Sequence, residues 1–315
     1  MHNLPFETKK RKILCKDKEF KVNKKTPKYS VDDLFKCGVI VLDKPKKYYC
    51  KQIDNKLVHA LEVPRVGHAG TLDPLVEGVL PILLAKATKF SEILSNAGKV
   101  YNCIMHIHDD VDEKKVKKVL KSFEGKIKQF PPKKSAVKRQ WRTREIYGIK
   151  FISMNRRDVI FRVWCEAGTY IRTLCVDVGE ELGIGAHMLS LRRIQVANLK
   201  IDDAIGFFKL TADYHDYLKT KKEDLIKKII LPKEKALSHL PRVWVDNNIK
   251  ERLKNGSPIF APGILALDSK IEKGENVAVL SEDNELWVVG KAEMNSTEML
   301  KKSKGMAVKT FMVLI

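Results

Sequence analysis

Residues 65–82 read Arg65-Val-Gly-His-Ala-Gly-Thr-Leu-Asp-Pro74 and then Leu75-Val-Glu-Gly-Val-Leu-Pro-Ile82. Two glycines, a threonine and an Asp-Pro pair within ten residues predict a tightly bent loop between apolar runs. Asp73 has two interpretations at this point. It is either a turn residue that accepts backbone N–H bonds or a carboxylate that a rigid loop holds above a cleft, and composition does not choose between them.

The composition around this loop indicates a globular protein with a polyanionic partner. A chain of 315 residues corresponds to about two domains, and 44% hydrophobic residues are enough to form a core. The formal net charge of +21 indicates binding to a polyanion. The apolar run Gly78–Ala85 is far shorter than a membrane span, and no apolar segment of a secretory signal follows the basic N-terminus. We therefore expect a cytoplasmic protein without membrane contact.

Cysteine and histidine spacing argues against a metal site. The six cysteines form no CxxC pair, so we expect reduced, inert and mostly buried thiols. His106 and His108 would lie on one face of a strand, but two ligands without a third do not make a metal site. The sequence has neither a G-x-x-x-x-G-K-[ST] loop nor a strand-linked G-x-G-x-x-G, so no metal and no organic cofactor is expected.

Hydrophobic periodicity predicts an α+β fold rather than regular βαβ alternation. Alternating or short apolar runs predict strands over residues 38–42, 100–108, 144–154 and 159–166. Apolar residues that recur at helical spacing predict helices over residues 112–124 and 170–182.

The last part of the chain has a different pattern. A lysine-rich helical stretch near residues 213–230 precedes short apolar runs that Gly and Pro turns separate. These runs predict strands over residues 243–245, 264–267, 277–280, 286–289 and 308–314. Short strands at this spacing suggest a small β-barrel module, with a domain boundary near residue 236.

The N-terminal region is an arm of high positive charge. Residues 9–28 hold ten Lys or Arg and only two acidic residues. Such a run by itself is usually a solvated or disordered segment. In a chain of net charge +21, we interpret the arm as a source of phosphate contacts, which position a nucleic acid without reading its sequence.

The bent loop resembles the signature loop of TruB-type pseudouridine synthases, in which the aspartate is catalytic. Other segments resemble further motifs of this family in the same order. They are Gly38–Pro45, Lys99–Tyr101, Phe130–Lys138, Ala167–Leu174 and Leu191–Arg193. The resemblance implies a pseudouridine-synthase catalytic domain over residues 36–235, with a mixed, mainly antiparallel sheet and helices.

Within this TruB/dyskerin family, the chain is more similar to the archaeal homologue of dyskerin, the catalytic subunit of box H/ACA guide-RNA particles. The stretch Phe123–Tyr147, the basic arm over residues 1–35 and the C-terminal module carry this likeness. Residues 236–315 resemble a PUA domain, a small β-barrel that in guide particles holds the ACA end of the guide RNA. The arm is expected to pack with this module or on RNA. The implied partners are tRNA, rRNA and guide RNA, with a zinc-ribbon-like, a small β-barrel and a kink-turn-binding protein.

Two segments depart from the family pattern. After Asp43-Lys-Pro45 the family usually continues x-G-x-T-S-H, whereas this chain reads Lys46-Lys-Tyr-Tyr-Cys-Lys51. The final L-R-R normally precedes T-R-S-G, whereas Ile194-Gln-Val-Ala-Asn198 follows it here. These differences concern loop geometry and RNA contacts rather than the chemistry.

The resemblance implies a set of roles in the isomerisation of uridine to pseudouridine. Asp73 is the nucleophile in the exchange of the glycosidic bond of a flipped-out base. Arg172 pairs with Asp73 and holds it ionised and oriented through a planar guanidinium. Tyr101 stacks on the uracil and is a candidate for the proton transfer at C5.

Five further residues are implied as substrate contacts. Tyr170 and Leu191 close the apolar walls of the pocket. His68 resembles a histidine that fills the space left by the flipped base, and without the motif it would be a loop histidine with satisfied ring nitrogens. Lys44 and Lys138 are either phosphate contacts or plain surface lysines.

Three readings of the function remain distinct. The leading one is an RNA isomerase that acts on rRNA under a guide RNA, on uridine-55 in the T-arm of tRNA, or on both. The second is a non-catalytic RNA-binding scaffold built on the PUA domain and the basic arm. The last is a glycosidase-like hydrolase, which needs a second carboxylate across the bond. Asp43, Glu77 and Asp177 are available for that role in the sequence.

Overall fold

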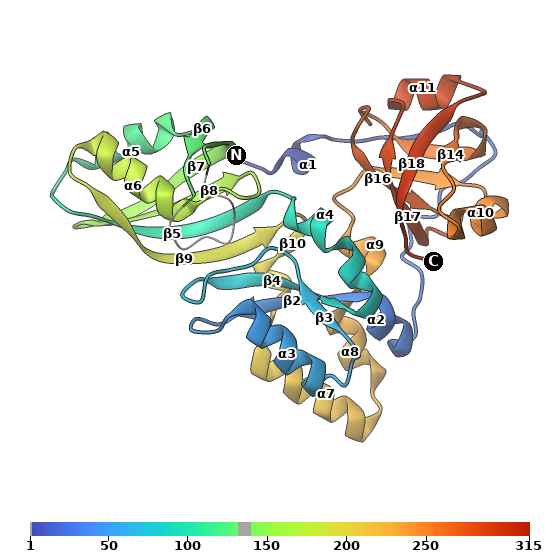
Figure 1. Cartoon of the computed structure of the whole chain (residues 1–315), viewed down its shortest axis with the longest axis horizontal. Helices are drawn as coiled ribbons and strands as arrows, with labels where there is room; N and C mark the ends of the chain where they lie inside the picture. The colour runs from blue at the N-terminus through green and yellow to red at the C-terminus, as the bar shows by residue number, and fades with distance from the viewer. Residues whose placement is uncertain (1, 132–139) are drawn as a thin grey trace. The chain divides into compact units, whose positions relative to one another are not determined.

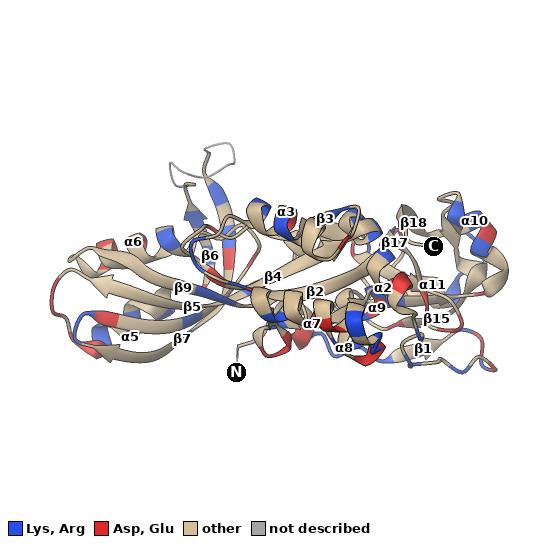
Figure 2. Ribbon diagram, turned by 90° about the horizontal axis from the view of Figure 1, so that it is seen from below, with Lys and Arg blue, Asp and Glu red and all other residues tan. Residues whose placement is uncertain are grey.

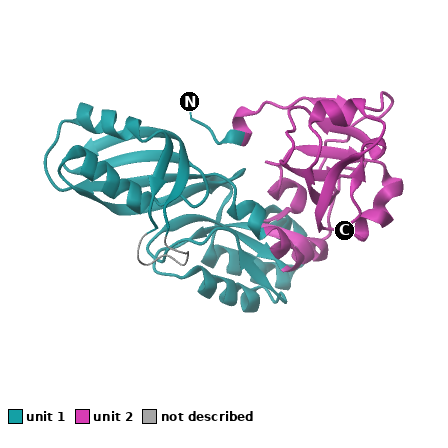
Figure 3. Cartoon of the chain, turned by 45° about the horizontal axis from the view of Figure 1, so that its top comes forward, with its two compact units in different colours: residues 1–5, 40–84, 91–229 teal, residues 6–39, 85–90, 230–315 magenta. Residues whose placement is uncertain are grey.

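The computed structural model describes residues 2–131 and 140–315, and the chain divides into two compact units (Figure 3). Unit 1 comprises residues 1–5, 40–84 and 91–229, and unit 2 comprises residues 6–39, 85–90 and 230–315. Helices and strands are mixed in both units (Figure 1). The predicted α+β class is therefore confirmed.

Unit 1 is built on a mixed sheet with the strand order β11-β2-β4-β9-β5-β8-β7-β6, in which β10 adds to β9 and β3 adds to β4. The strands are β2 (Gly38–Lys44), β3 (Val66–His68), β4 (Glu77–Leu84), β5 (Lys99–Ile107), β6 (Gly125–Gln129), β7 (Arg142–Asn155), β8 (Asp158–Cys165), β9 (Ala186–Val196), β10 (Leu199–Lys200) and β11 (Ile205–Gly206). The run from β9 through β5, β8 and β7 to β6 is antiparallel, whereas β4 and β9 run parallel.

The helices of unit 1 cover this sheet and end at recognisable signals. They are α3 (Cys50–Ala60), α4 (Ser91–Ser95), α5 (Glu113–Ser122), α6 (Ile171–Leu182), α7 (Phe207–Thr220) and α8 (Glu223–Ile229), with a 3-10 turn η2 (Ile201–Asp203). Asp112 caps α5 by accepting bonds from the backbone N–H groups of Lys114 and Lys115. Gly183 ends α6 with a φ of 77°, in the left-handed region. Helices α5 and α6 contact each other and the sheet (Figure 1).

Most of the elements predicted for this unit are confirmed. The strands expected over residues 38–42, 100–108, 144–154 and 159–166 are β2, β5, β7 and β8, and the two expected helices are α5 and α6. The helical stretch near residues 213–230 is two helices, because Lys221 adopts a left-handed φ of 57° between α7 and α8. The sequence did not predict β4, β9 or α3. Strand β9 mixes polar and apolar residues without strict alternation, so its extended structure depends on pairing with β5.

Unit 2 contains a seven-stranded sheet with the order β1-β15-β13-β16-β17-β18-β14. The strands of this sheet are β1 (Ile13–Cys15), β13 (Arg242–Val245), β14 (Ile259–Phe260), β15 (Ile264–Asp268), β16 (Asn276–Leu280), β17 (Leu286–Ala292) and β18 (Met306–Val313), and the short strand β12 (Ile230–Pro232) lies outside it. The helices and 3-10 turns are α1 (Pro5–Thr8), α2 (Val31–Cys37), η1 (Ala85–Phe90), α9 (Lys233–Ala236), η3 (Asn247–Ile249), α10 (Lys250–Lys254), η4 (Ala261–Gly263) and α11 (Ser296–Lys301). The five strands predicted in the C-terminal module are β13, β15, β16, β17 and β18.

Part of the basic arm packs within unit 2. Strand β1 pairs antiparallel with β15. The Lys16 ammonium group donates to the carbonyls of Ala261, Met299 and Lys302, and Arg11 Nη2 donates to Glu275 Oε1 at 2.6 Å. These two cations are therefore engaged by protein groups, in contrast to our interpretation of the whole arm as a set of phosphate contacts.

Two further sequence expectations concern the thiols and the membrane. All six cysteines are unpaired, and Cys50, Cys103, Cys165 and Cys175 are buried, which confirms the prediction of mostly buried free thiols. Among residues 2–131 and 140–315, none of the helices has the length and the apolar character needed to span a bilayer.

Candidate active site

Unit 1 contains a pocket of about 290 Å³. It is lined by Gly70, Thr71, Leu72, Asp73, Val76, Ser95, Lys99, Tyr101, Gly168, Thr169, Tyr170, Ile171, Arg172, Met188, Leu191 and Arg193. The structure thus brings together five of the predicted site residues, from the bent loop, β5, the start of α6 and β9. They are Asp73, Tyr101, Tyr170, Arg172 and Leu191.

The bent loop lies between β3 and β4, as its glycines and its Asp-Pro pair predict. Gly70 has a φ of 77°, and a Cβ atom there would lie 3.2 Å from Nη1 of Arg193. Leu72, directly before Asp73, donates its N–H to the Cys50 thiol at 3.2 Å. Pro74, directly after it, accepts a bond from the N–H of Lys47 at 2.7 Å. The carboxylate is therefore carried by a loop that is held on both sides.

Asp73 forms an ion pair with Arg172 Nη2. The side chain of Asp73 is 54% exposed and that of Arg172 is 43% exposed, so the pair lies at the open side of the pocket. Arg172 is in the first turn of α6. The residue before this helix, Tyr170, is fixed through its backbone, because Gln129 accepts its N–H at 3.0 Å and donates to its carbonyl at 3.1 Å. The buried Gln129 side chain therefore orients the start of α6.

Tyr101 lies on β5, in the middle of the antiparallel sheet between β9 and β8. The register of β5 against β9 shifts between Val100 and Tyr101, where Ile194 of β9 is the extra residue, whereas β5 keeps an unbroken register against β8. Burial raises the pKa of the Tyr101 hydroxyl, and the adjacent Arg193 guanidinium opposes the rise. Burial therefore favours the neutral phenol over the phenolate at this position.

The sequence did not identify two cations of the pocket, Arg193 and Lys99, as site residues, although both lie in segments that resemble family motifs. Arg193 is 1% exposed, and it donates from Nε to Val79 O and from Nη2 to Gly70 O, both at 2.7 Å. Lys99 is 4% exposed, and its ammonium group donates to the carbonyls of Leu94, Ser95 and Ala97. Burial lowers the pKa of Lys99 to about 7. Apart from the motif match, nothing in the sequence separates these residues from surface cations.

The remaining predicted contacts lie in other places. Lys44 is fully buried, and its ammonium group donates to the carbonyls of Pro45, Pro74 and Val76, so the prediction of a surface position is wrong. The reason is that three backbone acceptors satisfy a charge that was expected to need water. His68 bonds through Nδ1 to Asp54 at 2.8 Å and through Nε2 to Thr71 at 3.0 Å. Lys138 falls outside the described residues.

The pocket has one carboxylate among its lining residues, namely Asp73. Of the carboxylates considered for a hydrolase, Asp43 pairs with Arg192 at 2.7 Å, and Glu77 lies 3.6 Å from the same guanidinium. In the part of the chain that the structure describes, no group of three or more His, Cys, Asp or Glu side chains is arranged to hold a metal ion. The geometry provides a carboxylate beside a guanidinium, a tyrosine and an apolar wall, an arrangement that can hold a planar base against the carboxylate.

Comparison with known families assigns almost the whole chain from residue 58 onward. The TruB family pseudouridylate synthase (N terminal domain) model matches residues 58–171, and the tRNA pseudouridylate synthase B C-terminal domain model matches residues 172–238. The PUA domain model matches residues 241–314. The first two matches contain all of the pocket residues.

Relatives of similar length support the same assignment. Proteins described as "Probable tRNA pseudouridine synthase B" are 41% identical in Pyrococcus abyssi, over 95% of this chain and 91% of the relative, and 40% identical in Methanothermobacter thermautotrophicus, over 87% and 84%. A chain in the crystal structure of a Cbf5-Nop10-Gar1 complex is 41% identical with a TM-score of 0.93, covering 99% of this chain and 96% of that one. A chain of an H/ACA RNP bound to a substrate RNA containing 2'-deoxyuridine is 38% identical with a TM-score of 0.91, covering 99% and 97%. The chain belongs to the TruB family of pseudouridine synthases and matches its Cbf5 (dyskerin) members in structure.

Proposed function

We propose that Asp73 is the nucleophile of uridine isomerisation in this enzyme. The observation that carries the proposal is that Asp73 is the one carboxylate among the residues lining the pocket and is paired with Arg172. Pseudouridine forms when the glycosidic C–N bond breaks, the uracil turns and its C5 joins the same sugar carbon. A carboxylate can hold the base or the sugar covalently while one bond is exchanged for the other.

We assign the remaining roles in the reaction to side chains next to Asp73. Arg172 orients Asp73 through a charge-assisted bond. Tyr101 stacks on the flipped uracil and is the candidate for the proton transfer at C5. In this step the C5 proton leaves after C5 has joined the sugar carbon, and N1, released from that carbon, gains a proton. Tyr170 and Leu191 contribute the apolar walls.

For the other predicted contacts, we propose positioning roles. The Lys44 ammonium group donates to the carbonyls of Pro74 and Val76 and so supports the loop directly after Asp73. His68 links the same loop to Asp54 and Thr71. Lys138 remains a predicted phosphate contact.

The proposed substrate is RNA, bound with the help of guide RNA and protein partners. The net charge of +21 supports a polyanionic substrate, and affinity is expected to fall steeply with salt. The solved relatives are a Cbf5-Nop10-Gar1 complex and an H/ACA RNP with substrate RNA, which supports a guide particle with small protein partners. In this proposal residues 36–235 are catalytic, residues 236–315 bind the ACA end of the guide RNA, and the arm over residues 1–35 packs with them. The sites are uridines of rRNA, uridine-55 of tRNA, or both.

The test is release of tritium from RNA labelled with 5-[³H]uridine. Two transcripts are compared, a tRNA and a guide-paired ribosomal fragment, with the purified chain alone and with guide RNA and partner proteins. Release from tRNA by the chain alone identifies a stand-alone enzyme. Release only with guide and partners identifies the catalytic subunit of a particle.

The control variant is Asp73→Asn, which keeps the shape of the side chain and removes the nucleophile. We expect it to bind RNA with wild-type affinity and to release no tritium. Wild-type release by Asp73→Asn contradicts the nucleophile. If the wild-type chain binds RNA but releases no tritium under either condition, the non-catalytic RNA-binding scaffold is the better description.

A further inference from the structure

The segment Lys46–Lys51 is where the chain departs from the family pattern x-G-x-T-S-H, and its backbone keeps the conformation that the glycine of this pattern would favour. Lys47 stands at the glycine position and has a φ of 71°, in the left-handed region. This conformation is unfavourable for a residue with a side chain. The turn therefore keeps its conformation without the glycine, and the lysine side chain at this position is exposed.

The segment is attached to both sides of Asp73. The N–H of Lys47 donates to Pro74 O at 2.7 Å, directly after the aspartate. The Cys50 thiol accepts a bond from the N–H of Leu72 at 3.2 Å, directly before it. A change in the position of this segment would therefore move the catalytic loop.

The segment also contacts β9, the strand that carries the pocket residue Leu191. Lys46 Nζ donates to Ser190 Oγ on β9 at 3.3 Å, and Ser190 lies between Leu189 and the pocket residue Leu191. The same ammonium group lies 3.9 Å from Glu77 at the start of β4. Residues 46–50 therefore contact both the loop that carries Asp73 and strand β9. We call this segment, together with the exposed residues of that loop and of β9 beside it, the rim.

Basic and aromatic side chains of this rim face solvent. Lys46 and Lys47 are exposed, and Tyr49 is 61% exposed. Leu75 on the catalytic loop is 71% exposed and Leu189 on β9 is 56% exposed. Basic residues continue along α3, which begins directly after Tyr49 (Figure 2). The rim therefore combines positive charge with uncovered apolar surface.

The neighbouring tyrosine explains why Tyr49 is held outward. Tyr48 lines a small apolar cavity together with Ile53 of α3 and Phe207 and Phe208 of α7. Lys56 Nζ lies 5.4 Å from the centre of the Tyr48 ring. Tyr48 is thus an anchor, and the next residue projects from a fixed backbone.

We propose that Lys46, Lys47 and Tyr49 bind the RNA strand that flanks the target uridine. The two ammonium groups contact phosphates, and the Tyr49 ring stacks on an unpaired base. Extrusion of the target nucleotide unstacks its neighbours, and exposed aromatic rings bind such bases without reading their sequence. This inference rests on the proposed function, because it requires an RNA substrate with a flipped uridine at the pocket.

The first test removes the Tyr49 ring. Tyr49→Ala is expected to raise both the Kd and the KM for the RNA about 10-fold, with the rate at saturating RNA unchanged, because a stacking contact is lost outside the reacting groups. Tyr49→Phe keeps the ring and is expected to behave as wild type. A Tyr49→Ala variant with wild-type Kd and KM overturns the stacking contact.

The second test separates charge from backbone strain. Lys47→Gly restores the family residue, and Lys221→Gly is its matched control, since Lys221 is also exposed, has a φ of 57° and ends α7 at the end opposite Phe207. Both variants are expected to raise the Tm, because both relieve a left-handed lysine. Only Lys47→Gly is expected to weaken RNA binding and to reduce the slope of log Kd against log salt by about 0.7. Equal RNA affinity of the two variants overturns the phosphate contact.

The outcomes also distinguish this inference from the proposed function. If Asp73→Asn releases tritium, the proposed chemistry fails, whereas the binding data for Tyr49 and Lys47 still decide whether the rim binds RNA. If Tyr49→Ala and Lys47→Gly leave RNA affinity unchanged and instead abolish binding of a Nop10-type protein, the rim is a protein interface and the proposal is overturned.

Discussion

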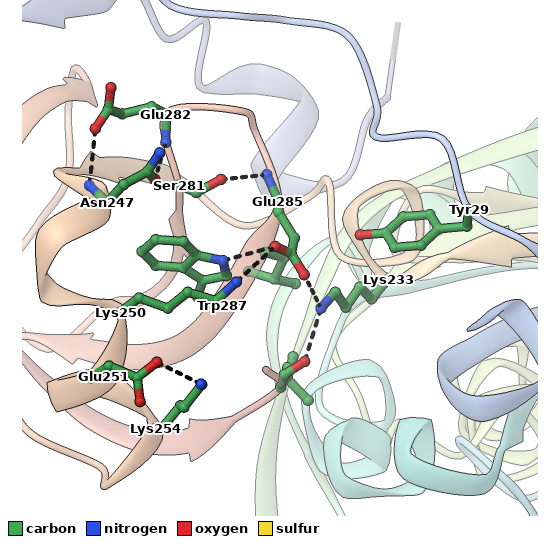
Figure 4. Close-up of polar contacts among 12 residues, drawn as sticks. Tyr29, Lys233, Asn247, Lys250, Glu251, Lys254, Ser281, Glu282, Glu285 and Trp287 are labelled. Carbon is green, nitrogen blue, oxygen red and sulfur yellow. Dashed lines mark hydrogen bonds and ion pairs between the residues drawn. The ribbon is translucent and has the colours of Figure 1, made fainter.

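The Asp73–Arg172 pair of unit 1 and the Glu285 cluster of unit 2 both join a carboxylate to cations, and they differ in what else surrounds the carboxylate. Asp73 is 54% exposed and lies on a pocket wall. Glu285 accepts a bond from Trp287 Nε1 at 3.0 Å, and Lys233 Nζ and Lys250 Nζ lie at 3.6 and 3.9 Å (Figure 4). Both carboxylates line a pocket, of about 290 and 280 Å³, so the difference between them lies in exposure and in bound donors. The Glu285 side chain is 31% exposed and has three donors or cations around it, whereas Asp73 is paired with Arg172.

Glu234, next to this cluster, is saturated at one oxygen only, since its buried Oε2 has no hydrogen-bond partner among the described residues. One carboxylate oxygen accepts bonds from the Tyr29 hydroxyl and from the N–H of Leu286, both at 2.8 Å. Burial raises the pKa of Glu234. These contacts join the segment around residue 29 to β17 within unit 2 and leave no opening for a ligand at that oxygen. The exposure of the side chain and the number of bound donors, rather than a charge pair or a nearby pocket alone, distinguish Asp73 from the carboxylates of this cluster.

The largest effect that tests this comparison is expected at Asp73. Asp73→Asn should lower the rate of pseudouridine formation by at least about 10⁴-fold, because the covalent nucleophile is lost. The Tm should change little, since Asp73 is half exposed. Single-turnover assays of tritium release and a thermal melt measure both quantities. A large fall in Tm would mean that this pair is structural like the cluster of unit 2.

A second large effect is expected at the buried cation behind the pocket. Arg193→Met should lower the free energy of unfolding by about 3 kcal/mol, because the carbonyls of Gly70 and Val79 lose their donors. It should also slow the reaction, since the loop that carries Asp73 loses its support. Denaturant titration and single-turnover kinetics provide the measurements. The matched control is Arg192→Met on the same strand, whose guanidinium is 36% exposed and should be needed less for stability.

A smaller effect is expected in unit 2. Glu285→Gln removes the charge opposite Lys233 and Lys250 and should lower the free energy of unfolding by about 1 kcal/mol. The rate at saturating RNA should stay at the wild-type value, in contrast to Asp73→Asn. The exposed Asp283→Asn in the same loop serves as the control for a general loss of negative charge. If Glu285→Gln lowers the rate at saturating RNA, Glu285 is needed for the reaction as well, and the distinction between it and Asp73 is wrong.

The smallest expected effect is a pH dependence at Asp177 on α6. Burial and the nearby Glu180 raise the pKa of Asp177 to about 6. The folded state therefore binds this proton more tightly than the unfolded state, and the resulting stability is present below about pH 4 and lost as the pH rises through about 6. Asp177→Asn should match the wild-type Tm at pH 4 and exceed it by about 2 °C at pH 7. Thermal melts across this range measure the difference, and a constant offset would argue against the raised pKa.

Periodicity was sufficient for the elements with a simple pattern. The helix α5 has its apolar residues on one stripe, and the strands of the C-terminal module are short apolar runs between turns, so both were predicted close to their observed limits. Strand β9 was not predicted, because its partners on β4 and β5 determine its extended conformation. For the same reason sequence reasoning identified Asp73, Tyr101 and Arg172 through their motifs but did not place Arg193 beside them.

By itself, the sequence determined the family, the positive charge that favours RNA and the motifs that contain the pocket residues, because these properties depend on residue type and order. Only the tertiary structure decided which charged groups are buried and which remain open. Lys44 and Lys99 look like surface lysines in the sequence, and each is held by three backbone carbonyls in the interior. Lys47 has the same side chain and is exposed in a left-handed turn beside Asp73. The physical reason is that the environment of a charge is set by backbone groups from distant segments, which only the folded chain brings together.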